Sequence, residues 1–179
     1  SVWLGFFLHD VLRTVTPLVE ERYGKAKAEG YRHQSARLRE ALDRMWQGDH
    51  FARAVSDSGE ILDYADALCS AWPLLSGATD PVKGETALLA GLGRLEKENM
   101  VLLLTPFFDE DSAPYPGRIA DYPPGVRENG GQYTHGASWL VDALTTLAHR
   151  ASEAGDAPAA ARWRRDALRV WLKISPLAH

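Results

Sequence analysis

The residue types most able to do chemistry gather between residues 122 and 139, in the stretch YPPGVRENGGQYTHGASW. Arg127 can bind an oxyanion or a carboxylate through two parallel hydrogen bonds. His135 comes just before a segment with a helical pattern, and main-chain N–H groups at the start of a helix favour anions. An arginine, a histidine and a helix N-terminus together predict a phosphate or sulfate site.

Three further polar residues of this stretch suit a sugar. Glu128, Asn129 and Gln132 combine the donors and acceptors that sugar hydroxyls require. The Gly-Gly pair between them permits positive φ angles, or lets a ligand approach the main chain closely. A structural interpretation stays open beside this one, because an Arg-Glu pair in a loop is commonly an ion pair and Thr134 could serve as a helix N-cap.

Apolar residues spaced three and four apart predict the elements that must hold this stretch in place. The predicted helices cover residues 3–22, 31–46, 61–75, 81–99, 136–152 and 157–173. Residues 21–30 should form a polar turn, and Gly48 and Gly77 suit helix C-termini. Asp80-Pro81 suits a helix start, since proline is favoured in the first turn.

These elements predict an all-α fold, made of helical hairpins with little strand. Such a fold is a helix bundle or an α/α toroid. No fixed-period repeat is visible, which counts against a solenoid of short helical repeats. One long loop, residues 105–135, interrupts the helices and holds five of the ten prolines. Its aromatic residues argue against disorder, and long ordered loops are usually functional.

Composition excludes several classes of function. The net charge of −4 and a pI near 5.8 argue against nucleic-acid binding. A single cysteine, Cys69, excludes an internal disulfide and fits a reducing compartment. Uninterrupted apolar runs such as VLLLTPFF are too short to cross a bilayer, so no membrane contact by this segment is expected. Because the chain starts without Met inside a patterned segment, we expect a piece of a longer protein.

Other side chains offer weaker candidates. Asp57 with Glu60 could act as a pair of carboxylates, although solvated turn charges are the commoner case. Trp3, Trp46 and Trp72 could stack on sugars, but aromatic residues at helical spacing usually belong to the core. No HxxxH or HExxH spacing occurs, so no metal site is predicted.

The whole chain resembles the inverting disaccharide phosphorylases. The stretch from Tyr122 to Trp139 closely resembles a motif of this family, which includes cellobiose and chitobiose phosphorylases and the phosphorylase-like region of cyclic β-1,2-glucan synthases. Further family-like motifs occur in order, and they are SVWLGFFLHDVL, GDHFARAVSDSG, LDYADALCSAWPLLSGATDP and LLLTPFFD. The forms TPFFD and GVRENGGQYTH favour the cyclic β-1,2-glucan synthase branch.

The resemblance implies a fold and a reaction. The chain, residues 1–179, would be part of an (α/α)6 catalytic-type barrel, with its helices forming about half of it. The family reaction is reversible phosphorolysis of a β-glucosidic bond with inversion, in which phosphate attacks the anomeric carbon and an Asp protonates the leaving oxygen. Inorganic phosphate is then a co-substrate, and no further cofactor is expected.

The resemblance also assigns roles to residues. His135 matches the family histidine that helps to bind phosphate, and Glu128, Asn129 and Gln132 fall on the loop that faces sugar and phosphate. Arg127 adjoins them as a further substrate-binding residue. The implied partners are a β-glucan oligosaccharide, phosphate and the rest of the parent polypeptide.

The departures from the family pattern are equally informative. The family general acid lies in a DWNDG element, and this sequence contains none, so we expect the acid upstream of Ser1 and no activity from the chain alone. His50 stands where the family tends to have Trp or Tyr. The resemblance implies that the chain lies on the cytoplasmic side and that its parent is an inner-membrane protein. Two alternatives remain: a non-catalytic glucan-binding or structural helical module, and a hydrolase relative that uses water.

Overall fold

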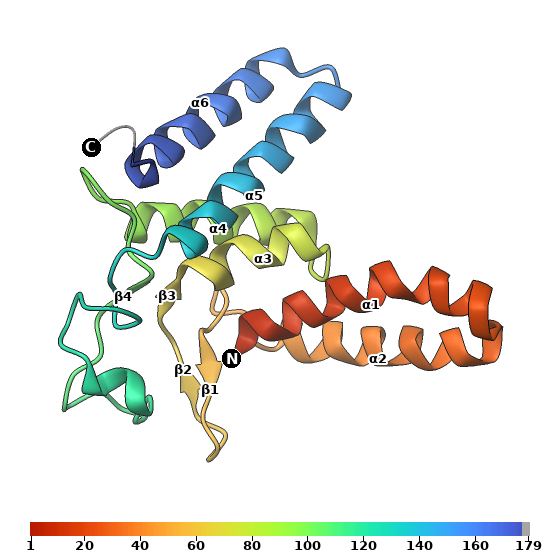
Figure 1. Ribbon diagram of the computed structural model, residues 1–179, viewed down its shortest axis with the longest axis horizontal. Coiled ribbons are helices and arrows are strands. Elements are labelled where there is room, and N and C mark those ends of the chain that lie inside the picture. Colours follow the sequence, from red (N-terminus) through yellow and green to blue (C-terminus); the bar gives the residue numbers. More distant parts are fainter. Residues whose placement is uncertain (177–179) are drawn as a thin grey trace.

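The computed structural model describes residues 1–176, and the last three residues of the predicted 1–179 domain lie outside the described part (Figure 1). Helices dominate it, which confirms the predicted all-α class. In the described residues the α-helices are α1 (Val2–Tyr23), α2 (Lys25–Asp43), α3 (Ala67–Ser76), α4 (Pro81–Leu95), α5 (Thr134–Glu153) and α6 (Ala157–Ile174).

The first hairpin differs from its prediction at the turn. We expected a polar turn over residues 21–30, but α1 continues to Tyr23 and α2 starts at Lys25. Gly24 alone makes the break, with a φ of 84° that a side chain would disfavour. The residues after it are mostly Lys, Ala and Glu, which are good helix formers. The predicted C-cap at Gly48 was wrong, because α2 already ends at Asp43.

The third helix begins later than its apolar pattern predicts. Residues 61–66 form two short strands, β2 (Ile61–Leu62) and β3 (Ala65–Asp66), instead of the first turns of a helix. Strand β2 pairs with β1 (Ala54–Val55), and β3 pairs with β4 (Leu104–Thr105), both antiparallel. Partners distant in the sequence supply these pairings, so local periodicity could not reveal them.

The expected signals at the α3–α4 turn are confirmed. Gly77 ends α3 in the left-handed region with a φ of 66°. The Asp80 carboxylate accepts hydrogen bonds from the main-chain N–H groups of Val82 and Lys83, and Pro81 occupies the first turn. Helix α4 ends at Leu95 instead of near residue 99, because Glu96 is extended and pairs with Val101.

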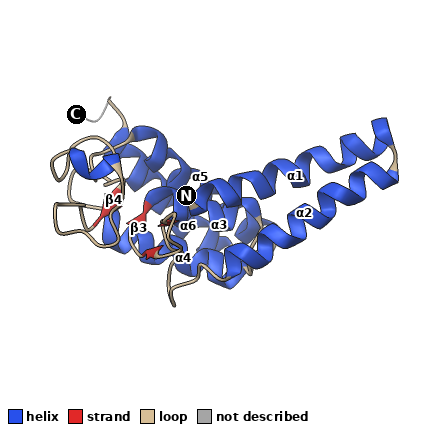
Figure 2. Cartoon of the chain, turned by 90° about the horizontal axis from the view of Figure 1, so that it is seen from below, coloured by secondary structure: helices blue, strands red, loops and turns tan. Residues whose placement is uncertain are grey.

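The odd-numbered helices form one layer, and each even-numbered helix packs back on its predecessor. Helix α3 lies between α1 and α5, whereas α2, α4 and α6 pack mainly on α1, α3 and α5 (Figures 1 and 2). An (α/α)6 barrel requires such inner and outer layers. The six α-helices of the described residues would supply three hairpins of such a barrel, and the barrel itself stays a prediction.

Helices α1, α3 and α5 begin at the same end of the molecule, and main-chain hydrogen bonds hold these starts together. The Val2 N–H donates to the Arg53 carbonyl, and the Ala67 N–H donates to that of Leu103. The Leu103 N–H in turn donates to the carbonyl of Gly131, just before α5. The long connections that precede α3 and α5 therefore gather at one end (Figure 1).

The long loop is ordered, as its aromatic content predicts. It contains β4 and a short 3-10 helix, η1 (Arg118–Asp121). Leu104 and Phe108 pack with Leu62 of β2 in a small apolar cluster, with Ile119 and Tyr64 against it. This cluster joins the loop to the β1–β2 hairpin.

Helix α1 has a property that its shorter apolar runs did not suggest. By length and composition it could cross a membrane, although 33% of its most apolar 18-residue window is buried. Its buried side packs on α2 and α3. The side chains of Leu4, Leu8 and Leu18 are exposed along it.

Close contact between α3 and α4 depends on a glycine. A Cβ on Gly91 would lie 2.1 Å from Oγ of the buried Ser70, whereas one on Gly93 would meet nothing within 4 Å. We expect Gly91→Ala to lower the free energy of unfolding by about 1–3 kcal/mol through overpacking. Gly93→Ala in the same helix should raise it by roughly 0.5–1 kcal/mol. Urea unfolding of both variants checks this, and equal effects would contradict the close contact.

Candidate functional site

The candidate phosphate-binding histidine lies in the first turn of α5. His135 is exposed, and its ring centroid is 5.9 Å from that of Tyr133. Thr134 was expected as a possible N-cap, but it is the first helical residue and Tyr133 occupies the cap position. No side chain of the described residues caps this helix, so its first N–H groups remain available to an anion.

Arg127, Glu128, Tyr122 and Tyr133 form a compact group beside this helix start. Nε of Arg127 is 3.4 Å from Oε2 of Glu128, and the guanidinium lies 4.6 Å from the ring centroid of Tyr122. Arg127 adopts a φ of 51°, in the left-handed region that non-glycine residues rarely occupy. Such backbone strain persists where the surroundings hold it, and it clusters at functional sites.

Mutual interactions shift the ionisation of this group. The main chain of Glu128 itself and then the Tyr133 hydroxyl lower the pKa of the Glu128 carboxyl, and hydrogen bonding to this carboxylate raises the pKa of Tyr133. Hydrogen bonding to Tyr133 chiefly raises the pKa of Arg127. The site therefore presents a firmly charged guanidinium beside a firmly charged carboxylate.

One acceptor of this group has no hydrogen-bond partner among the described residues. Oε2 of Glu128 is shielded from solvent and only approaches Arg127. A shielded carboxylate oxygen without a donor is costly unless a ligand supplies one.

Asn129 is fully buried, and its side-chain amide hydrogen-bonds to main-chain groups of the long loop. Its Oδ1 accepts from the Phe108 N–H at 2.7 Å, and its Nδ2 donates to the carbonyl oxygens of Phe108 and Tyr122 at 2.8 Å each. This amide ties the two halves of the long loop together. Direct contact between Asn129 and a sugar stays an untested prediction.

Gln132 also turns a polar group toward the main chain. Its Oε1 accepts from the Val101 N–H at 3.0 Å, although the residue is exposed overall. Gly130 and Gly131 allow the tight path before it, because an added Cβ would lie 2.3 Å from the Phe107 ring or 2.8 Å from the Arg127 carbonyl oxygen. The structure thus places Arg127, Glu128 and the start of α5 near one another, and gives Asn129 and Gln132 supporting contacts.

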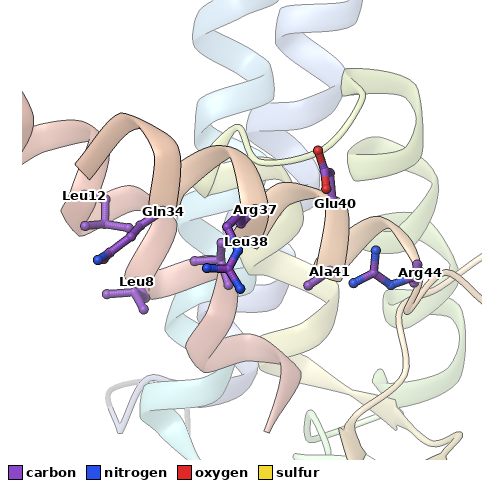
Figure 3. Close-up of a pocket in the computed structure, with 8 residues that line it drawn as sticks. All are labelled: Leu8, Leu12, Gln34, Arg37, Leu38, Glu40, Ala41 and Arg44. Carbon is purple, nitrogen blue, oxygen red and sulfur yellow. The ribbon is translucent and has the colours of Figure 1, made fainter. Parts of the chain in front are cut away.

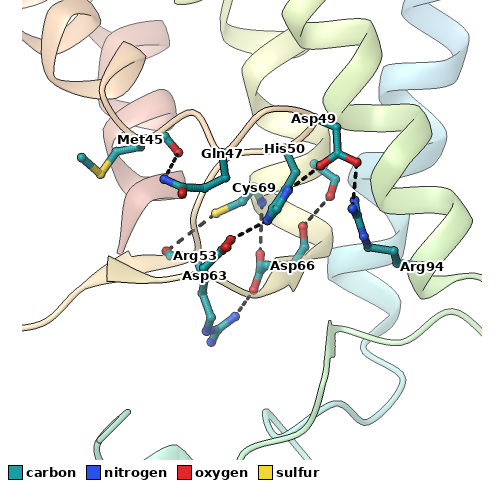
Figure 4. Close-up of polar contacts among 10 residues, drawn as sticks. Met45, Gln47, Asp49, His50, Arg53, Asp63, Asp66, Cys69 and Arg94 are labelled. Carbon is teal, nitrogen blue, oxygen red and sulfur yellow. Dashed lines mark hydrogen bonds and ion pairs between the residues drawn. The ribbon is translucent and has the colours of Figure 1, made fainter. Parts of the chain in front are cut away.

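The anchor behind the loop is an ion pair that the sequence did not reveal. Asp66 is 2% exposed, accepts from the N–H groups of Leu68 and Cys69 at 2.9 and 3.1 Å, and pairs with Arg53 (Figure 4). Arg53 lies 5.9 Å from the ring centroid of Phe108, and burial lowers its pKa. The only sequence feature that could have drawn attention to Arg53 is its place in the family-like motif GDHFARAVSDSG.

A second polar network lies nearby. Both ring nitrogens of His50 are 2.7 Å from a carboxylate, Nδ1 from Asp49 and Nε2 from Asp63, and Asp49 also accepts from Arg94 (Figure 4). The Arg94 hydrogen bond chiefly lowers the pKa of Asp49. Asp63 therefore hydrogen-bonds to His50, and Asp66 is the cap of α3.

Trp72 and Cys69 have structural roles. Trp72 is buried, with its ring 4.8 Å from that of Trp139 and 6.4 Å from that of Trp3. Cys69 is a buried core residue, and burial raises the pKa of its thiol to about 11. Within residues 1–176 no group of three or more His, Cys, Asp or Glu side chains is arranged to hold a metal ion.

A groove on the α1–α2 hairpin holds none of the predicted site residues. It has a volume of about 350 Å³ and lies between Leu8 and Leu12 of α1 and Arg37 and Ala41 of α2 (Figure 3). Apolar side chains of α1 face the charged surface of α2 there. The chemistry expected from the sequence lies instead on the loop and at the start of α5.

The amino-acid sequence of the chain matches one family profile and is similar to the sequences of two known proteins. The family profile described as "Glycosyl hydrolase 94 superfamily, catalytic domain" matches residues 1–156. The chain is 34% identical over 189 aligned residues to the cyclic beta-(1,2)-glucan synthase NdvB of Rhizobium meliloti (strain 1021). It is 28% identical over 170 residues to the solabiose phosphorylase of Paenibacillus borealis.

These alignments differ in the share of each protein that they cover. The first covers 100% of this chain and 6% of NdvB. The second covers 87% of this chain and 21% of the solabiose phosphorylase. The chain therefore spans a small part of the length of both relatives.

The Asp66–Arg53 pair should contribute more to the free energy of unfolding than an exposed helix cap does. We expect Asp66→Ala to lower the free energy of unfolding by about 3–5 kcal/mol, because it leaves a buried guanidinium unpaired and removes the α3 cap. The control Asp80→Ala removes only the exposed cap of α4 and should cost about 1 kcal/mol. Denaturant unfolding measures both. Similar losses in the two variants would refute the anchoring role of the pair.

Proposed function

The chain belongs to the glycosyl hydrolase 94 superfamily, and from this premise we propose that it binds inorganic phosphate and a β-glucan at one site. Membership makes it part of a carbohydrate-active domain. The names of the relatives supply the ligand classes, since one is a β-1,2-glucan synthase and the other a phosphorylase. No cofactor beyond phosphate as a co-substrate is proposed.

The observation that carries the phosphate assignment is the uncapped start of α5 with His135 exposed on its first turn. Free N–H groups and the positive end of the helix dipole attract an anion there. Arg127, eight residues before His135, has a side chain that is 59% exposed, and it keeps its charge under all ordinary conditions. We assign phosphate to this surface, with His135 as its principal ligand.

The sugar assignment rests on Glu128. Its shielded Oε2 lacks a hydrogen-bond donor among the described residues, and its depressed pKa keeps it an acceptor near neutral pH. A glucan hydroxyl would donate to the Glu128 carboxylate, whose side chain is 40% exposed. Asn129 and Gln132 would then act mainly by fixing the loop that presents Glu128.

The proposed reaction is reversible phosphorolysis with inversion. A phosphate oxygen would form a bond to the anomeric carbon while the glucosidic C–O bond breaks, and the leaving oxygen would take a proton from a general acid. The sequence holds no DWND element for that acid, so we propose that the acid comes from elsewhere in a longer protein. The chain alone would then bind its ligands without turnover. We place this longer protein in a bacterium, with the domain on the cytoplasmic side of the inner membrane.

The phosphate assignment predicts a difference between two histidines of the same helix. His135→Ala should weaken phosphate binding by about tenfold or more, because a charge-assisted hydrogen bond is lost. His149→Ala is a matched control, since His149 is exposed near the other end of α5 and faces Glu153. Titration calorimetry with inorganic phosphate measures both. Equal affinities would refute the role of His135.

The reaction predicts a product that separates the alternatives. With linear β-1,2-glucan and phosphate, a longer protein that includes the acid-bearing segment should release glucose 1-phosphate, and the chain alone should release none. Free sugar formed without phosphate would indicate a hydrolase instead. Glucan binding without either product, even in the longer protein, would indicate a non-catalytic module.

A further inference from the structure

A groove runs between the β1–β2 hairpin and the long loop, and it is lined by the weaker carboxylate candidates Asp57 and Glu60 but by no residue of the stretch from Tyr122 to Trp139. It has a volume of about 590 Å³, larger than that of the groove on the α1–α2 hairpin. Residues 54–62 form one wall and residues 114–117 the other. Both walls belong to the connections that gather at the starts of α3 and α5 (Figure 1).

The hairpin wall presents a carboxylate in a fixed position. Oε2 of Glu60 accepts from Oγ of Ser58 at 2.7 Å, and Oγ of Ser58 lies 2.7 Å from Oγ of Ser56. Oγ of Ser56 in turn accepts from the Glu60 N–H at 3.0 Å. Asp57 adds a second carboxylate at the same turn. This closed network orders the Glu60 side chain before any ligand arrives, which reduces the entropy cost of binding.

The opposite wall presents an aromatic ring. Tyr115 lines the groove and is 66% exposed, between Pro114 and Pro116. An exposed aromatic ring offers an apolar face with a polar tip, and proline neighbours restrict the backbone that carries it. The C–H face of a sugar ring can pack on such a surface.

The charges of the groove decide which ligand fits. No Lys, Arg or His lines it, and its only charged side chains are Asp57 and Glu60. Two carboxylates repel phosphate and other anions. A neutral polyol suits them, because its hydroxyls donate to carboxylates while its ring packs on Tyr115.

We propose that this groove is a second sugar subsite, in which Tyr115 stacks on a glucose ring and Glu60 accepts hydrogen bonds from its hydroxyls. It would hold a part of the glucan chain away from the phosphate at α5. The inference rests on the proposed function, since it names a further contact for the same substrate.

The position of the groove supports this role. Leu62 of the hairpin packs on Phe108 of the loop, and the main chain of Phe108 is held by Asn129, which directly follows Glu128 in the chain. Asn129 thus links the apolar cluster behind the groove to Glu128 of the candidate site. A glucan bound at Glu128 could extend along this end of the molecule.

The test compares affinities of the chain for a linear β-1,2-gluco-oligosaccharide and for inorganic phosphate by titration calorimetry. Tyr115→Ala and Glu60→Gln should each weaken oligosaccharide binding by about tenfold, through lost ring burial and a lost charged acceptor. Neither should change phosphate affinity. Tyr115→Phe keeps the ring and should retain most of the affinity.

Two control variants make the same kinds of substitution at positions outside the groove. Tyr23→Ala removes a ring that is 70% exposed at the end of α1, and Glu110→Gln neutralises an exposed carboxylate of the same loop outside the groove. Both should bind the oligosaccharide like the unaltered chain. Thermal unfolding of each variant confirms that the fold is kept.

The outcomes separate this inference from the proposed function. Unchanged oligosaccharide affinity in Tyr115→Ala and Glu60→Gln overturns the subsite and leaves the phosphate assignment standing. Absence of oligosaccharide binding by the unaltered chain overturns the subsite together with the sugar part of the proposed function. A loss of phosphate affinity only in His135→Ala, with loss of oligosaccharide affinity only in the groove variants, supports both.

Discussion

The buried carboxylate of Asp66 is the interaction on which the site end of this molecule depends. A buried charge must be paired and hydrogen-bonded, and Asp66 meets this need with the first N–H groups of α3 and with Arg53. Arg53 then lies over Phe108, and Asn129 holds the main chain of Phe108. One charge at the start of α3 is thus linked, contact by contact, to the loop that carries Arg127.

This chain of contacts explains how a loop of about thirty residues stays ordered with little regular structure. Side chains supply the hydrogen bonds that helices or sheets would otherwise supply, and the buried amide of Asn129 supplies three of them. Arg127 and His135 remain exposed, whereas Oε2 of Glu128 is shielded and has no hydrogen-bond partner among the described residues. Buried amides and ion pairs thus fix the backbone, and the exposed side chains of Arg127 and His135 lie where a ligand can reach them.

Local signals in the sequence predicted the helices, the boundaries at Gly77 and Asp80-Pro81, and the stretch that holds the candidate site residues. These signals failed where the local structure is determined by contacts with residues distant in the sequence. Ile61 and Leu62 continue the apolar pattern of α3, yet they form a strand because Ala54 and Val55 pair with them. Asn129 has the composition of a sugar ligand, but its burial against Phe108 shows only in three dimensions. Arg53 carried no local signal, because its partners are 13 and 55 residues away.

The central claim is that phosphate binds at the start of α5, on the surface formed with Arg127. Nuclear magnetic resonance of the isotopically labelled chain during titration with inorganic phosphate tests it most directly. The account predicts saturable shifts confined to the main-chain amides of residues 134–137, the His135 ring and the Arg127 guanidinium. Shifts spread over basic residues elsewhere, such as Arg162 and Arg165 of α6, with none at His135, would contradict it.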